Sequence, residues 1–182
     1  MIYIRDDDVL VRSSGYSDPV AQFKGVHQII ARQSKVLHVP TILVTEIQEF
    51  PDCIDYIWEE TCAGRMRPEI HGFKHIDYGK LPPAEIREHL LRCMDFILHQ
   101  FHYLPTKFYT PWGASTQDIR DVCKGLNLEM VDGSSRNKLR GKSGAWQMIQ
   151  DGYDLNEVWK GQDIHIHWWE DTERLEKVLE LL

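Results

Sequence analysis

Short apolar runs alternate along the chain with longer segments whose apolar residues recur at helical spacing. The short runs predict strands, because each is bounded by charged residues, Pro or Gly. These runs are Ile2 to Ile4, Thr41 to Thr45, Pro68 to His71, Lys107 to Tyr109, Leu128 to Val131 and Asp163 to Trp169. The first of them ends abruptly in three consecutive Asp residues.

The longer segments predict amphipathic helices. They run roughly from Pro19 to Leu37, from Phe50 to the residue before Gly64, from Pro82 to Phe101, from Ser115 to Leu126 and from Asp171 or Thr172 to the end of the chain. The clearest apolar stripe is that of the third helix, with Ile86, Leu90, Met94, Ile97 and Phe101. His99 and His102 lie on its polar side, so we expect them at the surface.

Regular alternation of strands and helices favours a parallel sheet with helices packed outside it. About six or seven strands are fewer than the eight of a complete barrel. We therefore predict a distorted or incomplete (β/α) barrel that forms a single domain over residues 1–182, with an open doubly wound sheet as the alternative. The chain of 182 residues suits one domain.

Carboxylates and imidazoles gather directly after the predicted strands. They are Asp6, Asp7 and Asp8 after the first strand, His71 and His75 after the third, Asp132 after the fifth, and His165 and His167 in the last; Pro111-Trp112-Gly113 ends the fourth. Parallel α/β folds build their sites at that edge of the sheet. We expect the functional site there.

A metal ion would explain two of these groups. Three adjacent carboxylates repel one another, and a divalent cation removes that repulsion. His71 and His75 have a spacing that lets two imidazoles converge, either on one face of a helix or in a loop where Gly72 lets the chain fold back between them. Two imidazoles and a carboxylate leave coordination positions open, as in catalytic sites. Zinc is the first choice, and cobalt, nickel and iron fit the same ligands.

Composition narrows the class of partner. A net charge of −7 disfavours general nucleic-acid binding. The basic stretch from Ser134 to Gly144 is interpreted as a solvated loop or as a flap over a polar substrate. Four Cys without a C-x-x-C pair suit a reducing compartment. Because no basic segment followed by an apolar run opens the chain and no run is long enough to span a membrane, we expect no membrane association and a cytoplasmic location.

The order of these groups resembles the polysaccharide deacetylases with a NodB-type domain, the family 4 carbohydrate esterases. The resemblance covers Ile2 to about Trp168 and consists of Asp-Asp, then His-x-x-x-His, then a Pro-aromatic-Gly turn, then a late strand His. Members of that family are metal-dependent enzymes on a distorted (β/α) barrel that remove acetyl groups from N-acetyl sugars. The resemblance implies that Asp8, His71 and His75 are the metal ligands.

The resemblance also implies the catalytic roles. Asp7 is similar to the family's base, and the backbone N–H near Trp112 takes the place of the oxyanion donor. His167 is similar to the general acid, and Asp132 is interpreted as the carboxylate that orients it. His165 shares the face of His167 on a strand, and His167 is preferred because it lies nearer the carboxyl end.

Two departures from the family pattern leave alternatives open. Tyr109 stands where the family has an Arg that pairs with the base. Arg5 lies two residues before Asp7 on the same face of the strand, so we hypothesise that Arg5 makes this pair. The first motif reads Asp6-Asp7-Asp8-Val9 instead of aromatic-Asp-Asp-Gly, so a slip by one residue would make Asp6 the base and Asp7 the ligand.

The sequence thus predicts a metal-dependent hydrolase that removes an N-acetyl or related acyl group from a sugar or polysaccharide. The alternatives are hydrolysis of a small non-sugar amide and a non-catalytic carbohydrate-binding relative. Aromatic rims stack on sugar rings, and Trp112, Trp146, Trp168, Trp169 and Tyr109 are expected at the rim. The sequence does not determine the oligomeric state.

Overall fold

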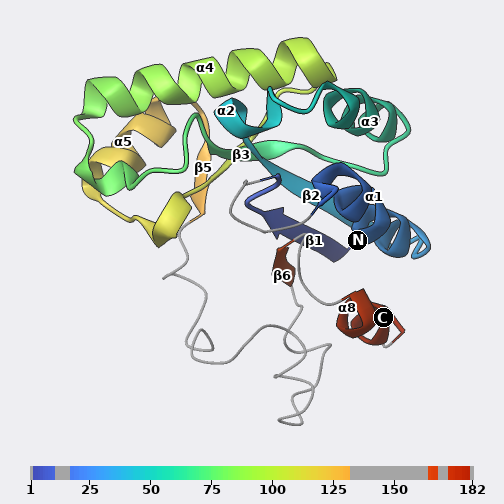
Figure 1. Cartoon of the computed structure of the whole chain (residues 1–182). Coiled ribbons are helices and arrows are strands. Elements are labelled where there is room, and N and C mark those ends of the chain that lie inside the picture. The colour runs from blue at the N-terminus through green and yellow to red at the C-terminus, as the bar shows by residue number, and fades with distance from the viewer. Residues whose placement is uncertain (1, 11–16, 132–163, 168–171, 181–182) are drawn as a thin grey trace, which may run out of the picture.

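The computed structural model describes residues 2–10, 17–131, 164–167 and 172–180 (Figure 1). These residues form one six-stranded sheet in which every paired strand is parallel. The strands are β1 (Ile2–Asp7), β2 (Val36–Leu43), β3 (Glu69–Gly72), β4 (Lys107–Tyr109), β5 (Glu129–Val131) and β6 (Ile164–His167). The predicted parallel sheet with about six strands is confirmed.

The strand order is β5-β4-β3-β2-β1-β6. From β1 to β5 each strand pairs with the next one along the chain, and β6 returns to the other side of β1. A doubly wound sheet instead reverses direction after its central strands. The observed order is that of a (β/α) barrel opened between β5 and β6, so the incomplete barrel is confirmed and the doubly wound alternative is wrong.

Helices cover one face of this sheet. They are α1 (Pro19–Ala31), α2 (Val44–Ile47), α3 (Pro51–Cys62), α4 (Pro83–Phe101), α5 (Gln117–Gly125) and α8 (Thr172–Leu179), with short 3₁₀ turns η2 (Tyr78–Lys80) and η3 (Pro111–Gly113). Right-handed crossovers that always step the same way place their helices on the same side. In Figure 1, α4 crosses that side with α3 and α5 against it.

Two predicted boundaries near β2 were wrong. The first helix ends at Ala31 instead of continuing to Leu37, and the strand begins at Val36. Pro40 therefore lies inside a strand that we expected to begin after it. It is tolerated because β2 pairs with β1 up to Pro40 and with β3 only from Thr41 onward, so the missing N–H falls where the partner strand changes.

The main core lies between the sheet and its helices. Within the predicted stripe of α4, Ile86, Leu90, Ile97 and Phe101 are buried and Met94 is half-buried. His99 and His102 are exposed, as expected from the polar side of that helix. None of the helices in the described part of the chain combines the length and the apolarity needed to cross a membrane.

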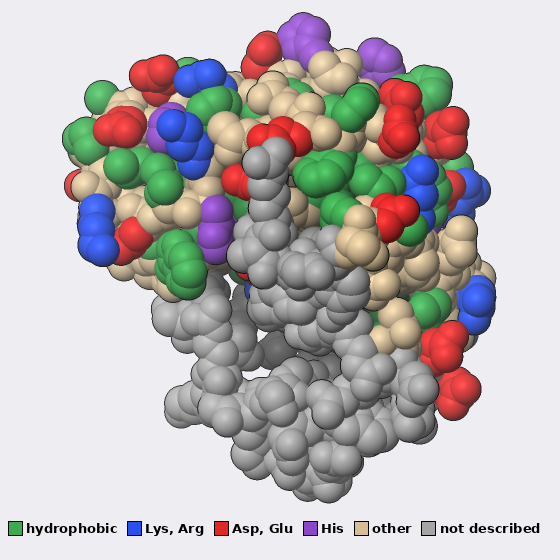
Figure 2. All heavy atoms as spheres, viewed as in Figure 1, with side chains coloured by type: hydrophobic (Ala, Val, Ile, Leu, Met, Phe, Trp, Pro, Cys, Tyr) green, Lys and Arg blue, Asp and Glu red, His purple; other side chains and the backbone are tan. Residues whose placement is uncertain are grey.

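The described surface mixes side chains of both charges. Figure 2 shows acidic, basic and apolar side chains interspersed over the face that it presents. Where the described residues are visible on this face, they form no continuous basic stripe. A continuous basic stripe is the usual electrostatic footprint of a nucleic-acid-binding surface.

Candidate metal centre

Three predicted ligands meet at the carboxyl edge of the sheet. Nε2 of His71 lies 2.9 Å from Oδ1 of Asp8, and Nε2 of His75 lies 3.0 Å from the same oxygen. The ligand-type atoms of Asp8, His71 and His75 all lie within 4.8 Å of one another. One divalent cation fits among them, because two imidazole nitrogens and a carboxylate oxygen are ligands that zinc and related metals accept.

Local structure orients the side chains of Asp8 and His71 toward each other. Asp8 is the first residue after β1 and has φ of 55°, a left-handed conformation that Asp adopts more readily than most residues. His71 lies in β3, and its Nδ1 donates a hydrogen bond of 2.8 Å to the carbonyl of Tyr109 in β4. With the proton on Nδ1, the Nε2 lone pair of a neutral His71 faces Asp8, which is the arrangement of a metal ligand.

His75 reaches the same place from a loop. It follows β3, and Gly72, with φ of 149°, turns the chain at the end of that strand. The His75 side chain is 21% exposed, and its ring lies 4.8 Å from the ring of Trp112. The sequence had left open whether the two imidazoles share a helix face or converge through a loop, and the loop is correct.

The Asp8 carboxylate is held in its ionised form. Burial raises the pKa of Asp8, but hydrogen bonds and charge from His71 and His75 outweigh burial and hold the pKa well below its usual value. The ionised form of a carboxylate is the one that coordinates a metal ion.

Asp7 lies on the inner face of the sheet, which is the face that the helices do not cover, and the cationic side chain of Arg5 lies beside it. Nη2 of Arg5 lies 2.8 Å from Oδ2 of Asp7, and the Thr41 hydroxyl donates a 3.0 Å hydrogen bond to Oδ1. Each carboxylate oxygen therefore has a partner. The Arg5 guanidinium also lies 4.9 Å from the centre of the Tyr109 ring. The structure thus brings Arg5 to Asp7, and Tyr109 supports the guanidinium by a cation–π contact.

Asp6 points to the opposite, helix-covered face. Its Oδ2 lies 3.3 Å from Nε2 of His38, and neither side chain is exposed. Nδ1 of His38 lies 3.0 Å from Nδ1 of His27 in α1, and Nε2 of His27 lies 2.9 Å from Glu60 in α3. The three adjacent carboxylates thus diverge to different partners. This divergence separates their charges, so the repulsion between adjacent carboxylates is not what supports a cation here; the cluster of Asp8 with His71 and His75 is.

Both imidazoles of this row resist protonation. Burial lowers the pKa of His38 to about 3. For His27, burial and then the charge of His38 lower the pKa to about 4, although Glu60 opposes them. Sequence reasoning missed this row, because His38 lay between the helix expected to end at Leu37 and the strand expected to begin at Thr41.

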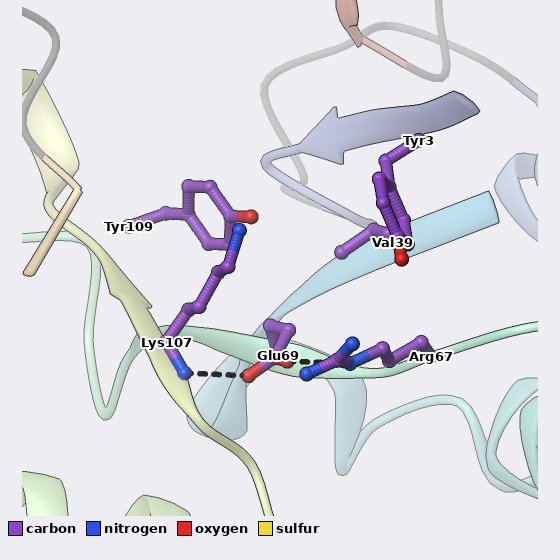
Figure 3. A pocket seen from close by; sticks show the side chains of 6 residues that line it. All are labelled: Tyr3, Val39, Arg67, Glu69, Lys107 and Tyr109. Atoms are coloured by element: carbon purple, nitrogen blue, oxygen red, sulfur yellow. Dashed lines mark hydrogen bonds and ion pairs between the residues drawn. The ribbon is translucent and has the colours of Figure 1, made fainter. Parts of the chain in front are cut away.

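A pocket of about 220 Å³ opens on the inner face of the sheet. It is lined by Tyr3, Val39, Arg67, Glu69, Lys107 and Tyr109. Figure 3 shows the rings of Tyr3 and Tyr109 on opposite sides of it. Tyr109 is 2% exposed. The prediction that it belongs to the rim was wrong, because strand alternation points it inward beneath Arg5. Trp112, at 71% exposed, does lie at the surface.

Glu69 ties together the two strands that position His71. Its buried carboxylate accepts hydrogen bonds of 2.8 Å from the backbone N–H groups of Thr106 and Lys107, and one of 3.0 Å from Nε of Arg67 (Figure 3). Charged hydrogen bonds of this kind are the stronger ones. They hold the start of β4 against β3. The sequence carried no signal for this role.

The remaining predicted residues lie at or beyond the edge of the described chain. In β6 the backbone of His167 pairs in register with Asp7, and that of His165 pairs with Arg5. The general-acid candidate thus belongs to the strand next to Asp7. Asp132, Trp146, Trp168, Trp169 and the basic stretch 134–144 lie outside the described residues.

Solved structures show which known fold the chain shares. Neither a protein-family model nor a curated protein matches its sequence. A family 4 carbohydrate esterase pseudoenzyme from Bacillus anthracis is 12% identical with a TM-score of 0.71, and the match covers 99% of this chain and 59% of that one. A family 4 carbohydrate esterase from Streptomyces lividans, in complex with acetate, is 14% identical with a TM-score of 0.67, covering 100% and 85%.

A third similar structure is the peptidoglycan deacetylase PdaC from Bacillus subtilis. It is 15% identical with a TM-score of 0.62, and the match covers 99% of this chain and 79% of that one. At these identities the likeness concerns the fold. The chain has the distorted (β/α) barrel of the family 4 carbohydrate esterases, as the order of its motifs predicted.

Proposed function

We propose that this chain is a metal-dependent hydrolase of the polysaccharide deacetylase type, which removes an N-acetyl or related acyl group from a sugar. The observation that carries the proposal is the convergence of Asp8, His71 and His75 on one point at the carboxyl edge of this fold. Two of the three similar structures described above are named as an esterase and a deacetylase, which supports an acetylated carbohydrate as the substrate class.

The proposed cofactor is a divalent metal ion, with zinc as the first choice and cobalt, nickel or iron as the others. A bound ion would lower the pKa of a water molecule and polarise the substrate carbonyl. Asp8, His71 and His75 would hold it and leave positions open. The tautomer of His71, set by the Tyr109 carbonyl, is the one that a metal ligand needs.

The proposed reaction uses Asp7 as the general base. Its carboxylate takes the proton of the attacking water. Arg5 and Thr41, one on each oxygen, hold the carboxylate in a fixed orientation. The backbone N–H near Trp112 is proposed to stabilise the oxyanion of the tetrahedral intermediate.

The proposed general acid is His167, which protonates the leaving amine. This step matters for amides, because an unprotonated amine is a poor leaving group. The parallel pairing of β6 with β1 supports the assignment, since it sets the backbone of His167 beside Asp7. Asp132 keeps its proposed role of orienting His167, and this role rests on the sequence resemblance alone.

Metal removal tests the proposal most directly. Exhaustive treatment with a chelator should abolish acetate release from N-acetylated sugars, and added zinc should restore it. The variant Asp8→Ala should purify folded but without metal, because one of three ligands is lost. Metal content by elemental analysis and acetate release by a coupled assay are the measurements. Full activity in chelated protein would overturn the proposal.

A non-catalytic carbohydrate-binding relative is the second candidate. Tyr109 in place of the family's Arg favours it, and so does the similarity to a protein named as a pseudoenzyme. Binding of sugar without acetate release, with every metal tested, would establish it. Release of acyl groups from small amides but not from sugars would instead assign a different substrate.

A further inference from the structure

The two imidazoles of the metal centre are fixed in different ways. His71 belongs to a strand, and its second nitrogen is anchored by the 2.8 Å bond to the Tyr109 carbonyl. His75 belongs to a loop, and within the described chain its only hydrogen-bonding partner is Asp8. The position of His75 therefore depends on the backbone of its loop.

That backbone is folded around the hydroxyl group of Tyr78. The hydroxyl oxygen accepts a 2.8 Å hydrogen bond from the N–H of Phe73. Phe73 lies between the two imidazoles in the sequence. Tyr78 is fully buried, so little water is at hand to replace this bond.

The fit around the hydroxyl is close. A Cβ atom at Gly72 would lie 2.9 Å from the Tyr78 oxygen, and the φ of 149° is one that side chains disfavour. The ring itself is held edge-on by Phe108 in β4, at 5.1 Å, and by His89 in α4, at 5.8 Å. These contacts hold the Tyr78 hydroxyl in place, and the loop after β3 is packed around it.

We infer that Tyr78 is a positioning residue for the metal centre: its hydroxyl fixes the loop from Gly72 to His75 and so holds His75 within reach of Asp8. The inference rests on the proposed function, because it assumes that this cluster binds a metal ion. Loss of the oxygen would leave the buried Phe73 amide without its acceptor. The loop would then relax, and among the three ligands His75 is the one that it carries.

The variant Tyr78→Phe tests the inference, because it removes the oxygen alone. Zinc affinity, measured by calorimetric titration or by competition with a chromophoric chelator, should fall ~10–100-fold, the usual effect of losing support behind a ligand. Hydrogen exchange at the Phe73 amide should accelerate in metal-free protein. The control is Tyr56→Phe, which removes a hydroxyl from a half-buried ring in α3, away from the strands and the loop that carry the three ligands, and should leave zinc affinity unchanged.

Each outcome has a distinct meaning. If the unaltered protein does not bind zinc or another divalent metal, the proposed function fails. If it binds zinc and Tyr78→Phe binds equally well, only the inference is overturned. A lower melting temperature with unchanged zinc affinity would also overturn it, because that result indicates a purely structural hydroxyl.

A second variant keeps the test decisive if Tyr78→Phe does not fold. Gly72→Ala places a methyl group against the Tyr78 oxygen and should weaken zinc binding by the same mechanism. Its control is Gly25→Ala in α1, where an added Cβ meets nothing within 4 Å. Unchanged zinc affinity in folded Gly72→Ala would contradict the inference.

Discussion

The inner and outer faces of the sheet at β1 hold neighbouring carboxylates in opposite ways. On the inner face, Asp7 is paired with a permanent cation, Arg5, and with a hydroxyl. On the outer face, Asp6 meets the imidazole of His38, whose pKa of about 3 keeps it uncharged. The difference shows that a side chain's face decides its role, since the two residues are adjacent and chemically identical.

The largest expected effect comes from removing the charge of the inner carboxylate. Asp7→Asn should lower kcat by ~10²–10⁴-fold, because an amide cannot accept the proton of the attacking water. Zinc content and melting temperature should change little. Asp6→Asn is the control and should alter stability more than kcat. The reverse pattern in acetate-release kinetics would assign the base to Asp6.

The outer row is the largely buried series of hydrogen-bonded side chains Asp6, His38, His27 and Glu60. Substitutions in it should change the stability of the protein and not its turnover. His38→Ala removes a fully buried, uncharged hydrogen-bonding partner of Asp6, so the free energy of unfolding should fall by about 1–3 kcal/mol. Urea denaturation measures it. His102→Ala, at an exposed position, should change the same quantity by less than about 0.5 kcal/mol. A similarly small change in His38→Ala would mean that the buried row contributes little to stability.

The outer row should also make stability depend on pH. The pKa of His27 is about 4 in the folded chain, below its ordinary value of 6.5, so as pH falls below 6.5 only the unfolded chain gains this proton. Stability is therefore complete above that pH and declines toward acid, by about 2 kcal/mol at pH 5 from His27 alone.

Thermal unfolding from pH 7 to pH 5 checks this expectation. The interval is informative because the pKa of Glu60 is lowered below 4.5, so that carboxyl group contributes only at still lower pH. His38 and His89, whose pKa values are also lowered, add to the decline. His27→Gln keeps a donor for Glu60 but cannot titrate, so it should flatten the slope. An unchanged slope would contradict the assignment.

The sequence predicted the parts of the site that depend on order along the chain. Asp8, His71 and His75 follow strands, and parallel strands bring their carboxyl ends together, so their convergence could be expected. The pairing of Arg5 with Asp7 followed from strand alternation, which sets residues two apart on one face. Both inferences required only the knowledge that a segment is a strand, and not which other segments it contacts.

The missed features depend on contacts between distant segments. The continuation of the first helix to Leu37 followed the apolar residues Val36 and Leu37, but those half-buried residues begin a strand. His38 and Glu69 look unremarkable in the sequence, because their partners lie in other elements. The role inferred for Tyr78 likewise appears only when the loop is seen folded around its hydroxyl.

The pairing of β1 with β6 also has a consequence for how the protein is made. The ribosome synthesises β1, which contains Asp7, long before it reaches β6, the strand near position 167 that pairs with β1. Until then one edge of the first strand is open to pairing with other chains. Contacts over so long a separation also form slowly. We therefore expect β1 and β6 to pair only after synthesis of the chain has passed β6. We also expect chains truncated before β6 to be prone to aggregation.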